Sequence, residues 1–70
     1  MPDLVSPMAG KVVEVEVKVG DQIELDQEVM VLESMKMDVP VYADVEGKVK
    51  EIKVKPGDQV NQGDTLAVLE

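Results

Sequence analysis

The sequence contains no cysteine and no histidine, and its single aromatic residue is Tyr42. Disulfide bonds therefore cannot form, and the usual structural zinc site, which needs thiolate or imidazole ligands, is excluded. A chain of 70 residues buries only about 60% of the surface that its unfolded form exposes, so one domain is the upper limit. Its core has to be built from valine, isoleucine, leucine and methionine. Valine dominates this set, and β-branched residues favour strands.

Long apolar runs and an excess of positive charge are missing as well. No segment approaches the ~20 apolar residues that a transmembrane helix needs. The start, Met1-Pro2-Asp3-Leu4, lacks the basic residues and the long apolar stretch of a signal peptide. Fifteen acidic against seven basic residues give a net charge of -8, which repels nucleic-acid phosphates and anionic membranes. We therefore expect a cytoplasmic protein that binds neither nucleic acid nor membranes.

The chain contains one motif twice. Residues 10–33 align without gaps with residues 47–70, and half of the aligned positions are identical. The longer identical stretches are Gly10-Lys11-Val12 with Gly47-Lys48-Val49, Gly20-Asp21-Gln22 with Gly57-Asp58-Gln59, and Val31-Leu32-Glu33 with Val68-Leu69-Glu70. Such self-similarity predicts two structurally equivalent halves related by a pseudo-two-fold axis. We expect residues 1–70 to form a single domain made of these half-repeats.

The repeat sorts positions into core and surface. Positions that are apolar in both halves are expected in the core: Val12/Val49, Val15/Ile52, Val17/Val54, Ile23/Val60, Val29/Leu66 and Val31/Val68. Positions that differ between the halves are expected to face water: Val13/Lys50, Leu25/Gln62 and Met30/Ala67. The core positions step by three rather than two after Val12 and again after Val49. This predicts a β-bulge near residues 13–14 and another near residues 50–51.

Turn residues divide the chain into short strands. Glycine, proline and aspartate mark two turns in each half, at residues 18–21, 26–27, 55–58 and 62–64. The first and third of these fit a type II turn, with glycine at the third position. No segment shows an apolar repeat at helical spacing, so the pattern predicts an all-β domain of seven or eight strands in two antiparallel sheets or a flattened barrel. Pro40 cannot donate to a ladder, so residues 37–42 should form an edge strand or contain a bulge.

The segment that joins the two halves breaks the pattern. Strand 28–33 runs into strand 37–42 with almost no loop, which predicts a tight hairpin with Met35 and Lys36 at its tip. Such turns need positive φ and normally use glycine, asparagine or aspartate, so this exception indicates function. The pseudo-dyad places the chain termini at the pole opposite Lys36, whose amine we expect in solvent. Met35 and Met37 either form exposed apolar recognition surface or fold back onto the barrel as core fillers.

Glu33-Ser34-Met35-Lys36-Met37, with Gly-Asp upstream and a Gly-Lys-Val strand downstream, resembles the attachment motif of biotinyl domains. The resemblance covers nearly the whole chain, from Ser6-Pro7-Met8-Ala9-Gly10 to the last strand, and extends to the small bacterial biotin/lipoyl attachment proteins. It implies a flattened barrel of two four-stranded antiparallel sheets with a quasi-dyad, known as a barrel-sandwich hybrid. The first half has no insertion relative to the second, so we expect no protruding "thumb".

The resemblance also implies a function, that of a biotin carboxyl carrier. A biotin protein ligase would join biotin covalently to Lys36, with Glu33, Ser34, Met35 and Met37 as recognition residues. The arm would then carry the carboxyl group from a biotin carboxylase to a carboxyltransferase within a biotin-dependent carboxylase, such as acetyl-CoA carboxylase. The sequence has no nucleophile–base pair, phosphate-binding glycine loop or metal-ligand cluster. We therefore expect a carrier subunit with no catalytic residues and no metal, and not an enzyme.

Two alternatives remain from the sequence. Ser34 stands where biotinyl domains usually have alanine, and it matches lipoyl domains, which usually read Glu-Ser/Thr-Asp-Lys-Ala. A lipoyl carrier, with lipoate on Lys36 instead of biotin or in addition to it, is therefore the first alternative. The second is an unmodified barrel that serves only as a protein-interaction module.

Overall fold

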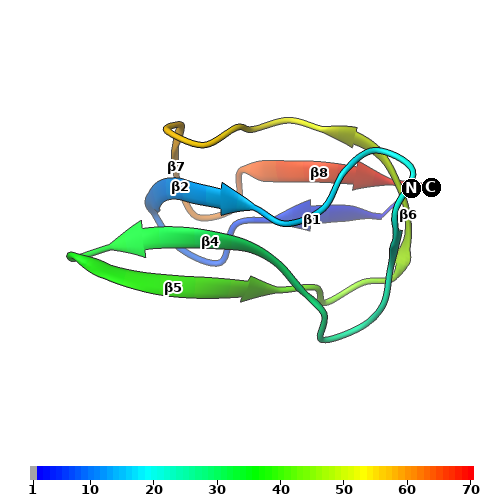
Figure 1. Cartoon of the computed structure of the whole chain (residues 1–70), viewed down its shortest axis with the longest axis horizontal. Coiled ribbons are helices and arrows are strands. Elements are labelled where there is room, and N and C mark those ends of the chain that lie inside the picture. The colour runs from blue at the N-terminus through cyan, green and yellow to red at the C-terminus, as the bar shows by residue number, and fades with distance from the viewer. Residues whose placement is uncertain (1) are drawn as a thin grey trace.

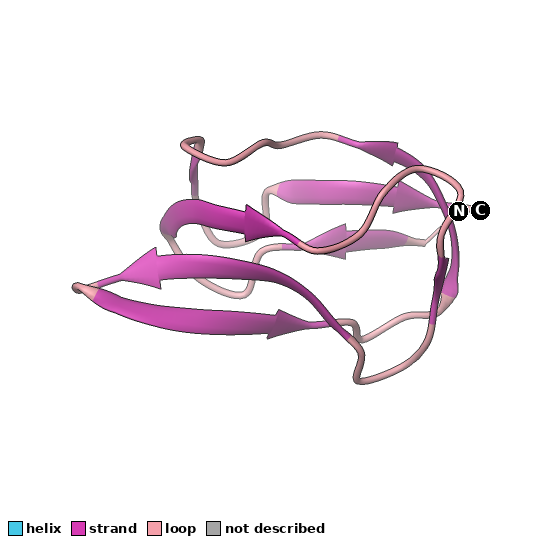
Figure 2. Ribbon diagram, in the orientation of Figure 1, coloured by secondary structure: helices cyan, strands magenta, loops and turns pink. Residues whose placement is uncertain are grey.

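The computed structural model describes residues 2–70, which form eight β-strands and no helix (Figure 1). The strands are β1 (Asp3–Val5), β2 (Gly10–Val15), β3 (Gln22–Ile23), β4 (Glu28–Ser34), β5 (Met37–Tyr42), β6 (Gly47–Ile52), β7 (Gln59–Val60) and β8 (Thr65–Leu69). They make two four-stranded antiparallel sheets, with the orders β1-β8-β6-β3 and β5-β4-β2-β7. Figure 2 shows that short loops connect these strands. The expected all-β fold of two sheets is confirmed.

The two halves of the repeat exchange strands. β2, from the first half, pairs with β7 of the second, and β6 pairs with β3. The backbone hydrogen bonds repeat accordingly: Val12 N–H donates to the Asp58 carbonyl and Val49 N–H to the Asp21 carbonyl, both at 2.8 Å. Neither half therefore completes a sheet without the other. The pseudo-two-fold relation that the sequence repeat predicted is present in the hydrogen bonding itself.

The predicted turns are also duplicated. Gly20 and Gly57 both have a φ of 98°, as the third position of a type II turn requires. In each of these turns the aspartate after the glycine caps the turn, because its Oδ2 accepts a hydrogen bond at 3.0 Å from the backbone N–H of Lys18 or Lys55. The β3–β4 connection, residues 24–27, is as long as the β7–β8 connection, residues 61–64. Hence no thumb interrupts the chain between these strands.

The core confirms most of the positions that the repeat predicted. The fully buried pairs are Val12/Val49, Ile23/Val60 and Val29/Leu66. Val15, Ile52 and Val54 are half-buried and pack against this core, while Val17 is buried. The predicted bulges are present as well, since the register shifts between Val12 and Glu14 in β2 and between Val49 and Glu51 in β6.

The assignment of Met30 and Ala67 to the surface was wrong, because both are completely buried. A second pair of bulges is responsible. The pairing of β4 with β5 shifts between Glu28 and Met30, and the pairing of β1 with β8 skips Leu66. Each bulge reverses the inward and outward phase of the strand that follows it. Val31 and Val68, expected in the core, are consequently only half-buried.

The molecule is elongated, with principal extents of 32 × 19 × 18 Å. The β4–β5 hairpin projects at one end, and both termini lie together at the other (Figure 1). β5 is an edge strand of its sheet, a position that tolerates Pro40, which has no backbone N–H to donate. The predicted polarity, with the repeat junction and the termini at opposite poles, is confirmed.

Candidate functional site

The tip of the β4–β5 hairpin is a two-residue turn made of Met35 and Lys36. Ser34 and Met37 form the last pair of the ladder, and the φ angles of the two turn residues are 53° and 64°. Positive φ at both central residues defines a type I′ turn, whose twist matches that of the flanking strands. A residue other than glycine costs about 1–3 kcal/mol in this region of positive φ. The hairpin therefore keeps two residues that local conformational preference disfavours.

The repeat shows that this strain is specific to the hairpin. In the described residues, three residues other than glycine have positive φ, namely Asp26, Met35 and Lys36. Asp26 is the first-half counterpart of Gly63, whose φ is 89°, so its conformation belongs to a duplicated turn. Met35 and Lys36 lie outside the two aligned repeats, residues 10–33 and 47–70. The fold needs a tight turn at this point, but it does not need these residue types.

All three side chains at the tip project into solvent. The exposed fraction is 92% for Met35 and 67% for Met37, and Lys36 is exposed as well. The alternative that the two methionines fill the core is therefore wrong. Within residues 2–70 the one ion pair joins Lys53 to Glu51 at 2.9 Å. The Lys36 amine is thus held by no carboxylate of the described chain, although its backbone is fixed by the ladder.

Glu33 and Ser34, the other predicted site residues, lie just behind the tip of the hairpin. Glu33 and Asp38 are opposite each other in the ladder and both are exposed, whereas Ser34 is half-buried. Glu33 also pairs with Lys11 on the adjacent strand β2. The structure thus brings the predicted motif residues together and adds Lys11, which the sequence analysis did not connect with the site.

Gly10 was not identified as a supporting residue, although the sequence contained a signal. A Cβ atom on Gly10 would lie 2.9 Å from the Glu33 carbonyl oxygen, and one on Gly47 would lie 2.9 Å from that of Glu70. Such distances are too short for a side chain, so glycine allows β2 to run against β4 beside the motif. The repetition of glycine at the same place in both halves is the signal that indicated this close approach.

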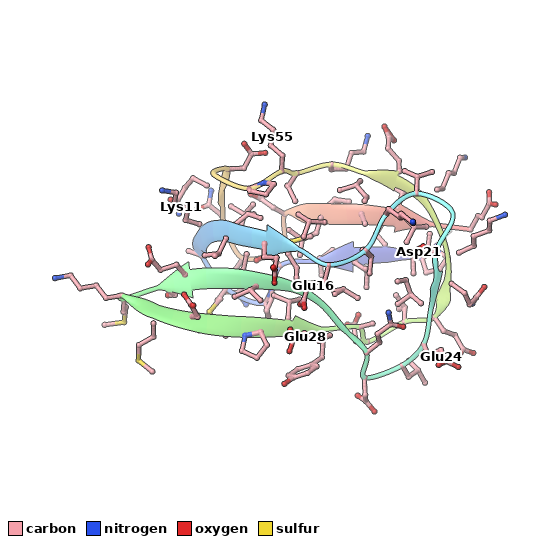
Figure 3. All side chains as sticks on the ribbon, in the orientation of Figure 1. Lys11, Glu16, Asp21, Glu24, Glu28 and Lys55 are labelled. Carbon is pink, nitrogen blue, oxygen red and sulfur yellow. The ribbon has the colours of Figure 1, made fainter. Side chains whose placement is uncertain are left out.

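One carboxyl group has a strongly altered pKa, and it lies far from the tip. A hydrogen bond with the Glu28 side chain raises the pKa of Glu16 to about 7, and desolvation and the negative charges of Glu28 and Glu14 act in the same direction. Glu16 directly follows β2 and Glu28 is the first residue of β4, and Figure 3 shows the two side chains close together. Glu28 begins β4, about 20 Å of extended strand away from the turn. Glu16 therefore cannot act as a base for the Lys36 amine.

Residues 2–70 enclose no pocket and bring together no group of three or more potential metal ligands. The same residues include no helix that is long and apolar enough to span a membrane. The features that stand out are therefore the projecting hairpin and its exposed lysine.

Comparison with known proteins connects this geometry to a family. The model of the biotin/lipoyl family, described as "Biotin-requiring enzyme", matches residues 2–69. The chain belongs to the biotin/lipoyl attachment family. The attachment domain is also 60% identical, over 62 residues, to the biotin/lipoyl attachment protein of Bacillus subtilis (strain 168). That alignment covers 89% of this chain and 85% of the relative.

Two solved structures contain a segment similar to this attachment domain. One is a single-chain, multi-domain long-chain acyl-CoA carboxylase, with a TM-score of 0.84 and 33% identity over 94% of this chain. The other is the urea carboxylase of Kluyveromyces lactis, with a TM-score of 0.87 and 36% identity over 99% of this chain. The attachment domain spans only 7% and 6% of the length of these two chains. Similar domains thus occur within much longer carboxylases.

Proposed function

We propose that this attachment domain is a biotin carboxyl carrier, in which a biotin ligase joins biotin to the amine of Lys36. The observation that carries the proposal is the position of Lys36, exposed on a fixed two-residue turn at one pole of the molecule. Two exposed methionines flank it, as in the motif of biotinyl domains. The similarity to segments of two carboxylases, at 33% and 36% identity, supports the same choice.

The tip fits covalent attachment. An ammonium group is not nucleophilic until it loses a proton, and no carboxylate of residues 2–70 forms an ion pair with the Lys36 amine. The ligase therefore has to take the proton and to supply biotin in activated form as biotinyl-AMP. Attack by the Lys36 nitrogen forms the amide bond and releases AMP. When bound, biotin supplies the atom that carries the carboxyl group.

The chain itself provides position and reach. The Lys36 backbone is fixed between two ladder strands, while the termini lie at the other end of a body 32 Å long. A flexible arm on such a body raises the local concentration of the carried group at each partner's active site. The partners proposed on this basis are a biotin carboxylase and a carboxyltransferase.

We assign recognition by the ligase to the residues next to Lys36. Met35 and Met37 offer adaptable apolar surface on both sides of the amine. Glu33 presents a carboxylate on the outer face of the hairpin, and Ser34 closes the ladder opposite Met37. A ligase that reads these residues needs an apolar depression around its active site and a basic group beside it.

The second candidate is a lipoyl carrier, and two observations favour it. Ser34 matches the lipoyl motif, and the relative that is 60% identical is named a biotin/lipoyl attachment protein. Either lipoate replaces biotin on Lys36, or both ligases use the same residue. The unmodified interaction module is the third candidate, and it predicts that neither ligase acts.

Parallel reactions with two ligases test the proposal. The unmodified protein is incubated with biotin ligase, ATP and biotin, or with lipoate ligase, ATP and lipoate, and its intact mass is measured. We expect one biotinyl group on the wild-type chain, none on Lys36→Arg, and an unchanged result for the matched control Lys55→Arg, another exposed turn lysine. Lipoylation without biotinylation would favour the second candidate, and no modification by either ligase would favour the third.

A further inference from the structure

The methionines of the described chain fall into two classes. Met30 is completely buried in the core, and Met8 is half-buried against it. Met35 and Met37 are 92% and 67% exposed and do not belong to the core or to the residues packed against it. The two sulfur atoms that no packing protects therefore lie on either side of the lysine at the tip.

Exposed thioethers are open to oxidation. The sulfur lone pair attacks one oxygen of hydrogen peroxide, the S–O bond forms as the O–O bond breaks, and the departing hydroxide takes up a proton to become water. The sulfur is oxidised by two electrons and the peroxide is reduced by two. The product, methionine sulfoxide, is polar and chiral where the thioether was apolar, and methionine sulfoxide reductases can reverse the change.

The fold tolerates this change at the tip and would not tolerate it in the core. A sulfoxide oxygen on Met35 or Met37 would point into water, because neither side chain packs against the barrel. The same oxygen on Met30 would be buried without a partner, at a cost in stability. Oxidation confined to the hairpin thus alters the recognition surface and leaves the scaffold intact.

We propose that Met35 and Met37 form a peroxide-oxidation site, and that their oxidation slows attachment at Lys36 while the barrel stays folded. The effect on attachment rests on the proposed function. A ligase that closes on Lys36 meets both neighbouring side chains, because they flank the amine in the turn and in the last ladder pair. The ligase would cover these thioethers, and a sulfoxide in their place would remove the apolar contribution of that contact. We expect kcat/KM for attachment to fall by about tenfold to a hundredfold.

Selectivity is measured first. The unmodified protein is treated with hydrogen peroxide under native conditions, catalase removes the excess, and peptide mass mapping gives the sulfoxide content at each methionine. We expect Met35 and Met37 to be oxidised well before Met30, with the circular dichroism spectrum and the melting temperature unchanged. Equal oxidation of Met30, or unfolding that accompanies oxidation of the tip, would overturn the inference.

Attachment is measured next, with biotin ligase, ATP and biotin. The rate of the treated wild-type protein should fall, and methionine sulfoxide reductases A and B with dithiothreitol should restore it. The Met35→Leu, Met37→Leu variant should show the same rate before and after peroxide, whatever that rate is. The Met8→Leu, Met30→Leu variant should remain as sensitive as the wild type.

Two results would contradict this part of the inference. The first is an attachment rate that stays unchanged after the tip methionines are oxidised. The second is an attachment rate of the Met35→Leu, Met37→Leu variant that falls on treatment with peroxide. Failure of the proposed function looks different, because the untreated protein would then accept no biotin. That result would remove the effect on attachment. The order in which the methionines are oxidised would still decide whether Met35 and Met37 form a peroxide-oxidation site.

Discussion

The carboxyl groups of Glu16 and Glu28 lie close together where β2 ends and β4 begins, whereas Lys53, the counterpart of Glu16 in the second half, forms an ion pair with Glu51. The first half of the duplicated scaffold therefore places the negative charges of Glu28 and Glu14 near Glu16, whereas the second half places Glu51 beside Lys53. The pKa of Glu16, raised to about 7 from its usual 4.5, expresses this difference.

The free energy of unfolding should consequently fall as the pH rises from 4.5 to 7. In this range the folded protein binds more protons than the unfolded chain, because the pKa of Glu16 is higher in the folded state. The Glu16→Gln variant keeps a hydrogen-bonding side chain and removes the repulsion, so it should be more stable than the wild type at pH 8 and closer to it at pH 4.5. Urea titrations at the two pH values measure this, with Asp44→Asn as control. A variant that differs from the wild type equally at both values would contradict the expectation.

The hairpin turn should become more stable when glycine replaces its first residue. Met35 has a φ of 53°, which costs a residue with a Cβ atom more than it costs glycine. We expect Met35→Gly to raise the free energy of unfolding by about 1 kcal/mol, as measured by urea denaturation. The control is Leu25→Gly, at another exposed apolar position in a turn, where glycine should give no gain. Equal effects of the two substitutions would show that the turn stores no strain.

Truncation of Met30 should be far more costly than truncation of Met37. Met30 is completely buried, so Met30→Ala leaves a cavity and should lower the free energy of unfolding by about 2–5 kcal/mol. Met37 is 67% exposed, and Met37→Ala should change this free energy by only about 0.5 kcal/mol or less. Chemical denaturation of both variants decides the matter. Similar losses would mean that the sulfur at the hairpin contributes to packing.

The repeat carried most of the structural information in the sequence. Identical residues in both halves predicted the type II turns, and a shared step of three residues predicted the bulges after Val12 and Val49. The burial prediction failed within β4 and β8, for the pairs Met30/Ala67 and Val31/Val68. Val29, Met30, Val31 and Leu32 are all apolar, so a pattern with a period of two has no phase there, and the bulge at Val29 determines which side chains turn inward.

The candidate site was predictable for a different reason. The predicted strands 28–33 and 37–42 leave room only for a tight hairpin, so the position of Lys36 at its tip followed from spacing. The contact between Glu16 and Glu28 could not be predicted in this way. It depends on how β2 and β4 align after each has passed through a bulge, and residue types alone do not determine that alignment.

The most direct test is the intact mass of the protein purified from its own source, followed by peptide mapping. We expect one biotinyl group per chain, attached to Lys36, and none on the chain that carries Lys36→Arg. A modified group on another lysine, or one that persists in Lys36→Arg, would contradict the assignment of Lys36 as the attachment residue.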